Sequence, residues 1–424
     1  MSLHRRIALA AVLCCSVDAF ANNGLLFVGF GSESLSMAGA DVAVARDTTA
    51  LNTNPAGLAQ IDGRAFDGYF TSSYAVDVGH KDARGNDVGV ANRLTPTIGL
   101  GYAQRLGGTA LTVGAGFFVQ GGAGNKFENL RTNAGTVDEL SARLAIYKFG
   151  PGLAYEASER LRLGASLSAV RATLEQKLFP DTSLVVPAPF FGIDVDGLEA
   201  TGWNLRLGMQ YLASDRLTLA AAYSPKTSLD FDGGSLRSNQ RAAGLGVVTY
   251  RDARIDGYAL PQEASLGAAW RHGGDRLLVS AKLSWLNWND ALNDQTLRAS
   301  DPSGPAAAAT ITRVSPLNWK DQYVLALGVA YRPGATTYYG GVNLANNPVP
   351  SDTLTPLLSP AIARKHATAG FSHPLRSGYR LSGGAVYVFP EKVSYSNPAL
   401  QPLIGSSEER IEYFGVNVTL SRNW

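Results

Sequence analysis

The side chains that most often catalyse reactions or bind metals are few in this sequence and lie far apart. After residue 21 the chain contains no cysteine and four histidines: His80, His272, His366 and His373. No Gly-x-Ser-x-Gly or His-Glu-x-x-His pattern occurs, although many hydrolases and zinc enzymes build their sites on such patterns. We therefore expect no catalytic residue, no metal and no cofactor. A serine–histidine lipase is the best enzymatic alternative.

Two other sets of residues could bind a small molecule. The stretch 178–193 is strongly apolar, although the pattern described below places it in a connection between strands. Its apolar residues include Leu178, Phe179, Val185, Val186, Phe190 and Phe191. Exposed apolar surface usually marks a binding site, so we expect ligand capture here; the alternative is packing against neighbouring loops or contact with lipopolysaccharide. Four cations could pair with a carboxylate group of a ligand, or else be solvated or paired with acidic residues: Lys148, Arg206, Lys282 and Lys320.

Composition and charge exclude several classes of protein. The chain has 424 residues and a net charge of +2, whereas nucleic-acid binders normally carry a clear basic excess. Both cysteines, Cys14 and Cys15, lie within the first 21 residues, so we expect neither disulfides nor thiolate sites. No later window reaches 18 uninterrupted apolar residues, so we expect no membrane-spanning helix.

Residues 1–21 are predicted to be an export signal. Arg5 and Arg6 precede a short apolar core, and Ala19-Phe20-Ala21 provides the small-x-small pattern of a cleavage site. The apolar core is too short to cross a bilayer as a helix. A lipoprotein signal is the minor alternative, because no small residue precedes Cys14.

From residue 64 onward, runs of 10–16 residues alternate apolar with small or polar side chains, and turns separate the runs. Tight turns are predicted at 107–108, 158–159, 214–215, 273–274, 333–334 and 377–378. Long connections are predicted near 77–91, 121–144, 178–196, 232–258, 291–318, 347–363 and 396–409. This strict alternation of short and long connections is typical of a transmembrane antiparallel β-barrel. We predict about 14 strands within 64–424; the alternative is a large secreted β-sandwich or β-helix.

The last strand shows the two expected faces of a barrel wall. Phe414, Val416, Val418 and Leu420 share one face, whereas small and polar side chains occupy the other. We expect the apolar face to contact lipid and the small, polar face to line the lumen. Trp424 ends this strand as an aromatic insertion signal would, so we expect recognition by the barrel-assembly machinery. Aromatic residues near strand ends are predicted to form lipid-facing girdles: Tyr102, Tyr155, Tyr211, Trp270, Trp285, Trp288 and Tyr331.

Residues 22–63 are predicted to be a plug inside the barrel. They are rich in small and apolar residues, and glycine and proline break any long helix. A linker or a disordered arm is the alternative, but such segments are usually more polar.

The stretch 29–59 resembles the N-terminal hatch of the FadL/TodX (OMPP1) family of outer-membrane hydrophobic-compound transporters. Asn54-Pro55-Ala56 is its most recognisable element, and Phe30 and Gly31 lie at its beginning. Further similarity follows in order along 221–234, 260–261, 319–331 and 347–371. The resemblance therefore covers nearly the whole chain after the signal.

The resemblance implies a monomer in the outer membrane of a Gram-negative bacterium, surrounded by lipid and lipopolysaccharide. Fourteen strands would enclose a hatch formed by residues 22–63. The implied function is passive uptake of hydrophobic compounds, with long-chain fatty acids expected first. The ligand would land on apolar external loops, pass to a pocket beside the hatch and leave sideways through the wall. The alternatives are aromatic or aliphatic hydrocarbons on the same route, a general porin, or a surface adhesin.

Overall fold

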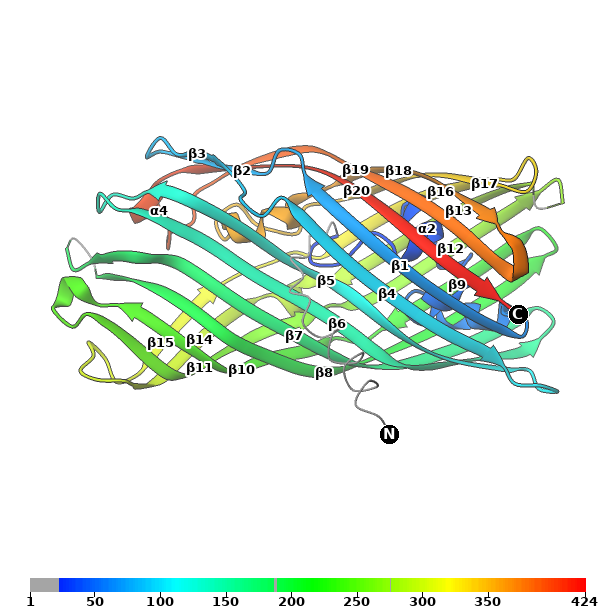
Figure 1. Cartoon of the computed structure of the whole chain (residues 1–424), viewed down its shortest axis with the longest axis horizontal. Helices are drawn as coiled ribbons and strands as arrows, with labels where there is room; N and C mark the ends of the chain where they lie inside the picture. Colours follow the sequence, from blue (N-terminus) through cyan, green and yellow to red (C-terminus); the bar gives the residue numbers. More distant parts are fainter. Residues whose placement is uncertain (1–22, 187–188, 275) are drawn as a thin grey trace.

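The structure, a computed structural model, describes residues 23–186, 189–274 and 276–424. The predicted export signal lies outside these ranges. The described strands form one antiparallel sheet that closes on itself, because the first strand, β1 (Arg64–Ala75), pairs along its length with the last, β20 (Ser407–Asn423). Figure 1 shows the resulting barrel with its strongly tilted strands. No helix in the described ranges is both long and apolar enough to cross a membrane.

Fourteen strand positions make up the described wall, ten of them continuous and four interrupted. The continuous strands are β1, β4 (Leu94–Arg105), β5 (Leu111–Arg131), β6 (Val137–Ser158), β7 (Leu161–Leu184), β8 (Phe190–Ser214), β17 (Thr337–Ala345), β18 (Lys365–Pro374), β19 (Tyr379–Tyr395) and β20. The interrupted positions are β9 (Leu217–Ser224) with β10 (Thr227–Asn239), β11 (Val247–Leu260) with β12 (Gln262–His272), β13 (Leu277–Asn287) with β14 (Asp294–Pro302), and β15 (Ile311–Pro316) with β16 (Gln322–Tyr331). Pro225 and Pro261 lie at two of the breaks, where a missing N–H cannot continue the ladder. The predicted strand number is confirmed.

Short elements connect these strands or lie inside them. The helical turns are α2 (Gly31–Ser36), η1 (Thr48–Leu51), η2 (Pro55–Gln60), η3 (Arg241–Ala243), α3 (Trp288–Ala291), η4 (Pro356–Ile362), η5 (Arg376–Gly378) and α4 (Gln401–Ile404). A small external hairpin, β2 (Gly79–Asp82) and β3 (Asp87–Gly89), pairs with the beginning of β20.

The predicted two-faced pattern of the wall is present. On β16 every second residue is exposed, and these residues are Tyr323, Leu325, Leu327, Val329 and Tyr331. On β20 the predicted apolar face is exposed, whereas the small and polar residues of the opposite face are buried in the lumen. The aromatic girdle is only partly as predicted, because Trp288 is fully buried. The helical turn α3 interrupts the strand at this residue, so the alternation that predicted an outward side chain no longer applies.

The extents of several predicted external loops are wrong, because the strands continue into them. β5 and β6 occupy most of 121–144, and β7 and β8 occupy most of 178–196. Likewise β10 and β11 occupy most of 232–258. The outward positions of these extensions carry polar residues such as Glu139, Lys177 and Glu175. Such positions lack the apolar repeat of a lipid-facing strand, so the sequence reads as a loop.

Residues 23–63, called the N-terminal segment below, lie inside the barrel (Figure 1). Its three helical turns contact different arcs of the wall: α2 packs against β17 to β20, η1 against β4 and β5, and η2 against β6 to β8. Other residues of the segment contact further strands of the wall: Met37 contacts β16 and β17, and Val42 and Ala43 contact β12. The lumen is therefore filled at the level of this segment.

Candidate functional site

Asn54 joins the N-terminal segment to itself and to the wall. Its side-chain Nδ2 donates to the carbonyl oxygen of Val42 at 2.8 Å and to that of Met209 on β8 at 3.1 Å. Its Oδ1 accepts from the backbone N–H of Ala56 at 3.2 Å and so caps η2. Pro55 occupies the first turn of η2, where its fixed φ is favourable and a backbone donor is not needed. The residue types of this tripeptide are therefore explained by local geometry.

Glycines in the wall allow the N-terminal segment to approach the strands closely. A Cβ atom at Gly208 of β8 would lie 2.0 Å from Oδ1 of Asn54, and one at Gly164 of β7 would lie 2.3 Å from the backbone N of Ala56. No side chain fits at such distances. On the other side, Ser32 of α2 donates from its hydroxyl to Asn417 of β20 at 2.5 Å. Glycine at these two wall positions thus reflects close packing against the segment.

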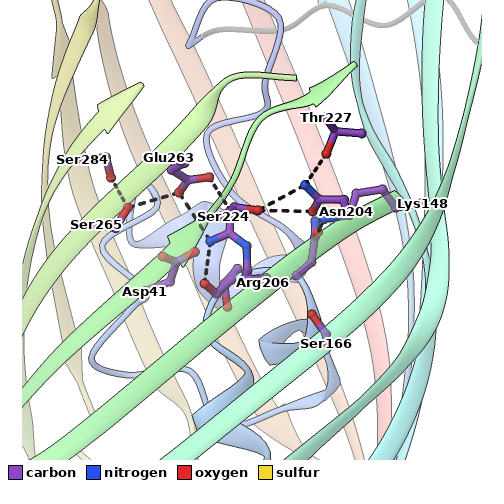
Figure 2. Close-up of polar contacts among 12 residues, drawn as sticks. Asp41, Lys148, Ser166, Asn204, Arg206, Ser224, Thr227, Glu263, Ser265 and Ser284 are labelled. Carbon is purple, nitrogen blue, oxygen red and sulfur yellow. Dashed lines mark hydrogen bonds and ion pairs between the residues drawn. The ribbon is translucent and has the colours of Figure 1, made fainter. Parts of the chain in front are cut away.

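Three of the four predicted ligand-binding cations contact the N-terminal segment. Lys148 on β6 donates from Nζ to Oδ1 of Asn52 at 2.8 Å. Lys282 on β13 pairs with Asp41 at 3.0 Å. Arg206 on β8 donates to the carbonyl oxygen of Thr53 at 2.9 Å and forms an ion pair with Glu263 on β12. Figure 2 shows Arg206 joined to Glu263, with Asp41 beside them and Lys148 reaching in from the neighbouring wall. These cations therefore have protein partners in this structure.

The fourth cation, Lys320, lies in the link between β15 and β16 and is exposed. Its backbone N–H donates to the carbonyl oxygen of Pro348 at 2.8 Å. It lines neither of the cavities described next.

A cavity of about 320 Å³ lies in the external half of the lumen, between β5 to β8 and η4 on one side and β14 and β15 on the other. We call it the external cavity. Its wall is mainly apolar, and its large aliphatic residues include Leu140, Leu144, Leu174, Leu178, Ile193 and Leu357. Its volume is within the range of small-molecule sites. Arg313, which the sequence analysis did not select, also lines it.

The predicted apolar stretch contributes to this region only in part. Leu178 lines the external cavity. Phe179 is fully buried and packs against Phe190, with ring centroids 6.4 Å apart, whereas Val185 and Val186 are exposed at the external tip of the β7–β8 hairpin. Phe191 is half-buried and pairs with Ser183 across that hairpin. The structure thus brings only one of the six residues to the cavity.

A smaller cavity of about 50 Å³ adjoins the N-terminal segment and is lined by Phe27, Phe30, Arg206 and Lys282 among others. Phe30 packs edge-to-face against Phe118 of β5, with ring centroids 6.2 Å apart. Gly31 follows Phe30 with a φ of +70°, the left-handed conformation that glycine adopts readily, and α2 begins there.

The wall beside this smaller cavity has an interrupted hydrogen-bond ladder. β4 and β5 pair from Arg105 with Thr112 as far as Gly99 with Phe118, and the remaining residues of β4, Leu94–Ile98, have no partner on β5. Beyond Phe118, β5 instead meets the N-terminal segment, because the N–H of Gly122 donates to the carbonyl oxygen of Leu25 at 3.0 Å. β5 residues 118–125 are buried on both faces. This strand therefore separates from β4 and bends toward the lumen while it stays paired with β6.

Two tryptophans connect the external cavity to the N-terminal segment. Trp319 follows Leu317 of the cavity wall and packs edge-to-face against Trp288, with ring centroids 5.2 Å apart. The Trp288 ring in turn packs so closely on Gly24 that a Cβ there would lie 2.7 Å from it.

A buried polar cluster ties the external β2–β3 hairpin to the barrel. His80 contacts Glu409 of β20 at 2.6 Å through Nδ1 and Asp82 at 3.0 Å through Nε2, and its side chain is fully buried. Burial disfavours the charged imidazole, but the hydrogen bonds to Asp82 and Glu409 outweigh this effect and raise the pKa of His80 to about 9. Among residues in the described ranges, no group of three or more His, Cys, Asp or Glu side chains could hold a metal ion.

Comparison with known proteins identifies the family to which this barrel belongs. Residues 13–421 match the family described as outer membrane protein transport protein (OMPP1/FadL/TodX). The chain is similar to the toluene transporter TodX of P. putida, with 21% identity, 94% of this chain and 99% of that chain covered, and a TM-score of 0.76. It is also similar to the toluene transporter TbuX of Ralstonia pickettii, with 21% identity, the same coverage and a TM-score of 0.73. A FadL homologue of Pseudomonas aeruginosa is 17% identical, covers 94% and 98%, and has a TM-score of 0.72.

The search of curated proteins gave no match. The three similar structures share the barrel fold with this chain, and the family match extends over nearly its whole length. The resemblance inferred from the hatch-like stretch is therefore confirmed. The chain belongs to the OMPP1/FadL/TodX family of outer-membrane transport proteins for hydrophobic compounds, and its location is the outer membrane of a Gram-negative bacterium.

Proposed function

We propose that this protein is a passive channel that carries long-chain fatty acids through the outer membrane. The observation that carries the proposal is the combination of an apolar external cavity, a lumen filled by the N-terminal segment, and an interrupted wall ladder beside that segment. An apolar ligand gains little from a water-filled pore, whereas an apolar cavity replaces its unfavourable contact with water. No energy input is needed, because the ligand moves down its own concentration gradient.

The proposed route has three stages. The ligand first enters the external cavity, where Leu144 and Leu178 contact it. It then moves past the Trp288–Trp319 pair to the smaller cavity beside the N-terminal segment, which acts as the hatch. It finally leaves sideways between β4 and β5, where the strands share no hydrogen bonds beyond Gly99 and Phe118.

Aromatic hydrocarbons are the second candidate ligands on the same route. Two of the similar structures are described as toluene transporters, and an apolar wall accepts an aromatic ring as well as an acyl chain. A general porin is disfavoured by the filled lumen, and an adhesin needs neither an internal cavity nor an interrupted wall.

Uptake measurements test the proposal. Cells that lack their own uptake proteins should accumulate labelled hexadecanoate, and should not accumulate a small sugar, only when this chain is produced. Gly121→Ala tests the exit, because its Cβ would lie 2.0 Å from the carbonyl oxygen of Leu25 and would displace β5 from the segment. Gly107→Ala is the matched control, since a Cβ there meets no atom within 4 Å.

We expect Gly121→Ala to reduce hexadecanoate uptake at least fivefold while binding to purified protein stays within twofold. Normal uptake by this variant would exclude the proposed exit. If cells producing the unaltered chain accumulate no apolar compound, the proposed transport function is wrong.

A further inference from the structure

The external cavity has one cationic corner in a mainly apolar wall, whose other polar lining residues are Gln176, Asn318, Asp352, Thr353, Thr355 and Asn397. The corner is formed by β14 and β15, which supply Gln295, Arg313 and Ser315. The opposite wall, from β5 to β8 and η4, is dominated by aliphatic side chains. A cavity with a cationic corner and an extended apolar wall matches an amphiphile better than a uniformly apolar molecule.

Strand register directs Arg313 into the cavity. Arg313 of β15 pairs directly with Leu297 of β14. Residues directly opposite each other in an antiparallel pair project from the same face, with Cβ atoms about 5 Å apart. Leu297 is buried and lines the cavity, whereas Thr312 and Val314, the neighbours of Arg313 along the strand, are exposed, although Val314 also borders the cavity. Arg313 is therefore on the lumen face.

Arg313 has no protein partner among the described residues. No ion pair or hydrogen bond joins its side chain to another residue there. The only other charged residue in the cavity lining is Asp352, which is exposed and forms no ion pair with it. By contrast, Arg206 and Lys282 at the smaller cavity are each paired with a carboxylate.

A partly buried, unpaired cation is unfavourable unless another molecule neutralises it. A guanidinium forms two parallel hydrogen bonds with a carboxylate, and such charge-assisted pairs are stronger than hydrogen bonds between neutral groups. A neutral hydrocarbon in the cavity would remove water from Arg313 and offer nothing in return.

We infer that Arg313 binds the carboxylate of the ligand in the external cavity and so selects monocarboxylate amphiphiles over neutral apolar compounds. This inference rests on the proposed transport function and adds the residue that determines specificity. The acyl chain lies along Leu144, Leu174 and Leu178, and the carboxylate lies at the β14–β15 corner. Ser315, on the same face of β15, is positioned to donate a further hydrogen bond.

Binding of two chain-matched ligands tests the inference. Purified full-length protein in non-ionic detergent is titrated at pH 9 with labelled hexadecanoate and, separately, with hexadecanol. Arg313→Gln should weaken hexadecanoate binding roughly 10- to 100-fold, the factor expected for one lost hydrogen-bonded charge pair. Hexadecanol binding should change less than about twofold, and that result also shows that the variant is folded. Arg313→Lys should restore most of the loss.

Arg298→Gln is the matched control, because Arg298 lies next to Leu297 on β14 but is exposed and pairs with Asp256. It should leave both affinities unchanged. A second measurement uses the unaltered protein alone, which should prefer hexadecanoate at pH 9 and lose this preference at pH 4, where the carboxylate is protonated.

The inference is wrong if Arg313→Gln weakens the binding of both ligands equally. It is also wrong if the unaltered protein binds both ligands with equal affinity at pH 9. Either result would leave the channel function intact. If the unaltered protein binds and transports neither ligand, the proposed function itself fails, and this inference fails with it.

Discussion

Replacing Asn54 with alanine should loosen the N-terminal segment from the wall. The substitution removes the cap of η2, which contributes about 1 kcal/mol. It also removes a buried hydrogen bond to Val42 and a partly buried one to Met209, which contribute about 1 kcal/mol each. The sum is about 3 kcal/mol, and at 1.4 kcal/mol per tenfold change this increases the undocked population roughly 100-fold. The strands of the barrel should stay intact, because Asn54 is not part of any strand ladder.

Hydrogen exchange of the purified protein measures this change. Backbone amides of 47–60 should exchange roughly 100-fold faster in Asn54→Ala, whereas amides of β16 should keep their rates. Planar bilayers give an independent readout, because a loosened segment should admit small ions through the lumen. Asn289→Ala is the control, since Asn289 is exposed in α3. Exchange within about threefold of the unaltered protein, together with unchanged conductance, would refute the view that Asn54 holds the segment in place.

Three further outcomes are expected. Gly208→Ala should displace the segment in the same way, because its Cβ would lie 2.0 Å from Oδ1 of Asn54. In the double variant with Asn54→Ala, the increase in exchange rate should therefore be smaller than the sum of the two single effects. Full additivity would contradict the contact. Leu144→Gln should weaken binding of hexadecanoate and hexadecanol alike, roughly tenfold, because it removes the apolar contact of one buried leucine; a loss confined to the carboxylate would contradict this role. His80 stabilises the docked β2–β3 hairpin as a cation, with a pKa raised to about 9. This stabilising contribution is complete below about pH 6.5 and is lost as the pH rises through about 9. The rate of proteolysis within 83–86, divided by the rate for a free peptide of the same sequence, should therefore increase between pH 7 and 10. In His80→Gln this ratio should not depend on pH.

The barrel could be predicted from the sequence because its physical constraint is repeated in every strand. Each lipid-facing strand must show apolar residues at every second position, and the segment 414–420 does so without interruption. The tight turns also have strong residue preferences. Outside the membrane this constraint disappears, and residues 137–144 therefore read as a loop although they belong to β6.

The candidate site was less predictable, because it depends on which distant side chains meet. The sequence showed that Lys148, Arg206 and Lys282 share the lumen face, but not that Asn52, Glu263 and Asp41 would contact them. Arg313 was missed because it lies in a region predicted to be a loop. The alternation of Ile311, Arg313 and Ser315 with Thr312 and Val314 was the only local sign of a strand there.

The length of the strands also determines where the ligand first meets the protein. β8 contains 25 residues, which corresponds to about 80 Å along the strand at roughly 3.3 Å per residue. With a tilt of about 40° the strand rises about 60 Å, whereas the apolar band of an outer-membrane barrel is about 25 Å tall. The tight turns are all at the opposite end, so most of the other 35 Å or so of this rise extends beyond the external surface of the membrane. On the proposed route, an apolar solute therefore first meets the protein well outside the lipid, at the external end of the extended barrel.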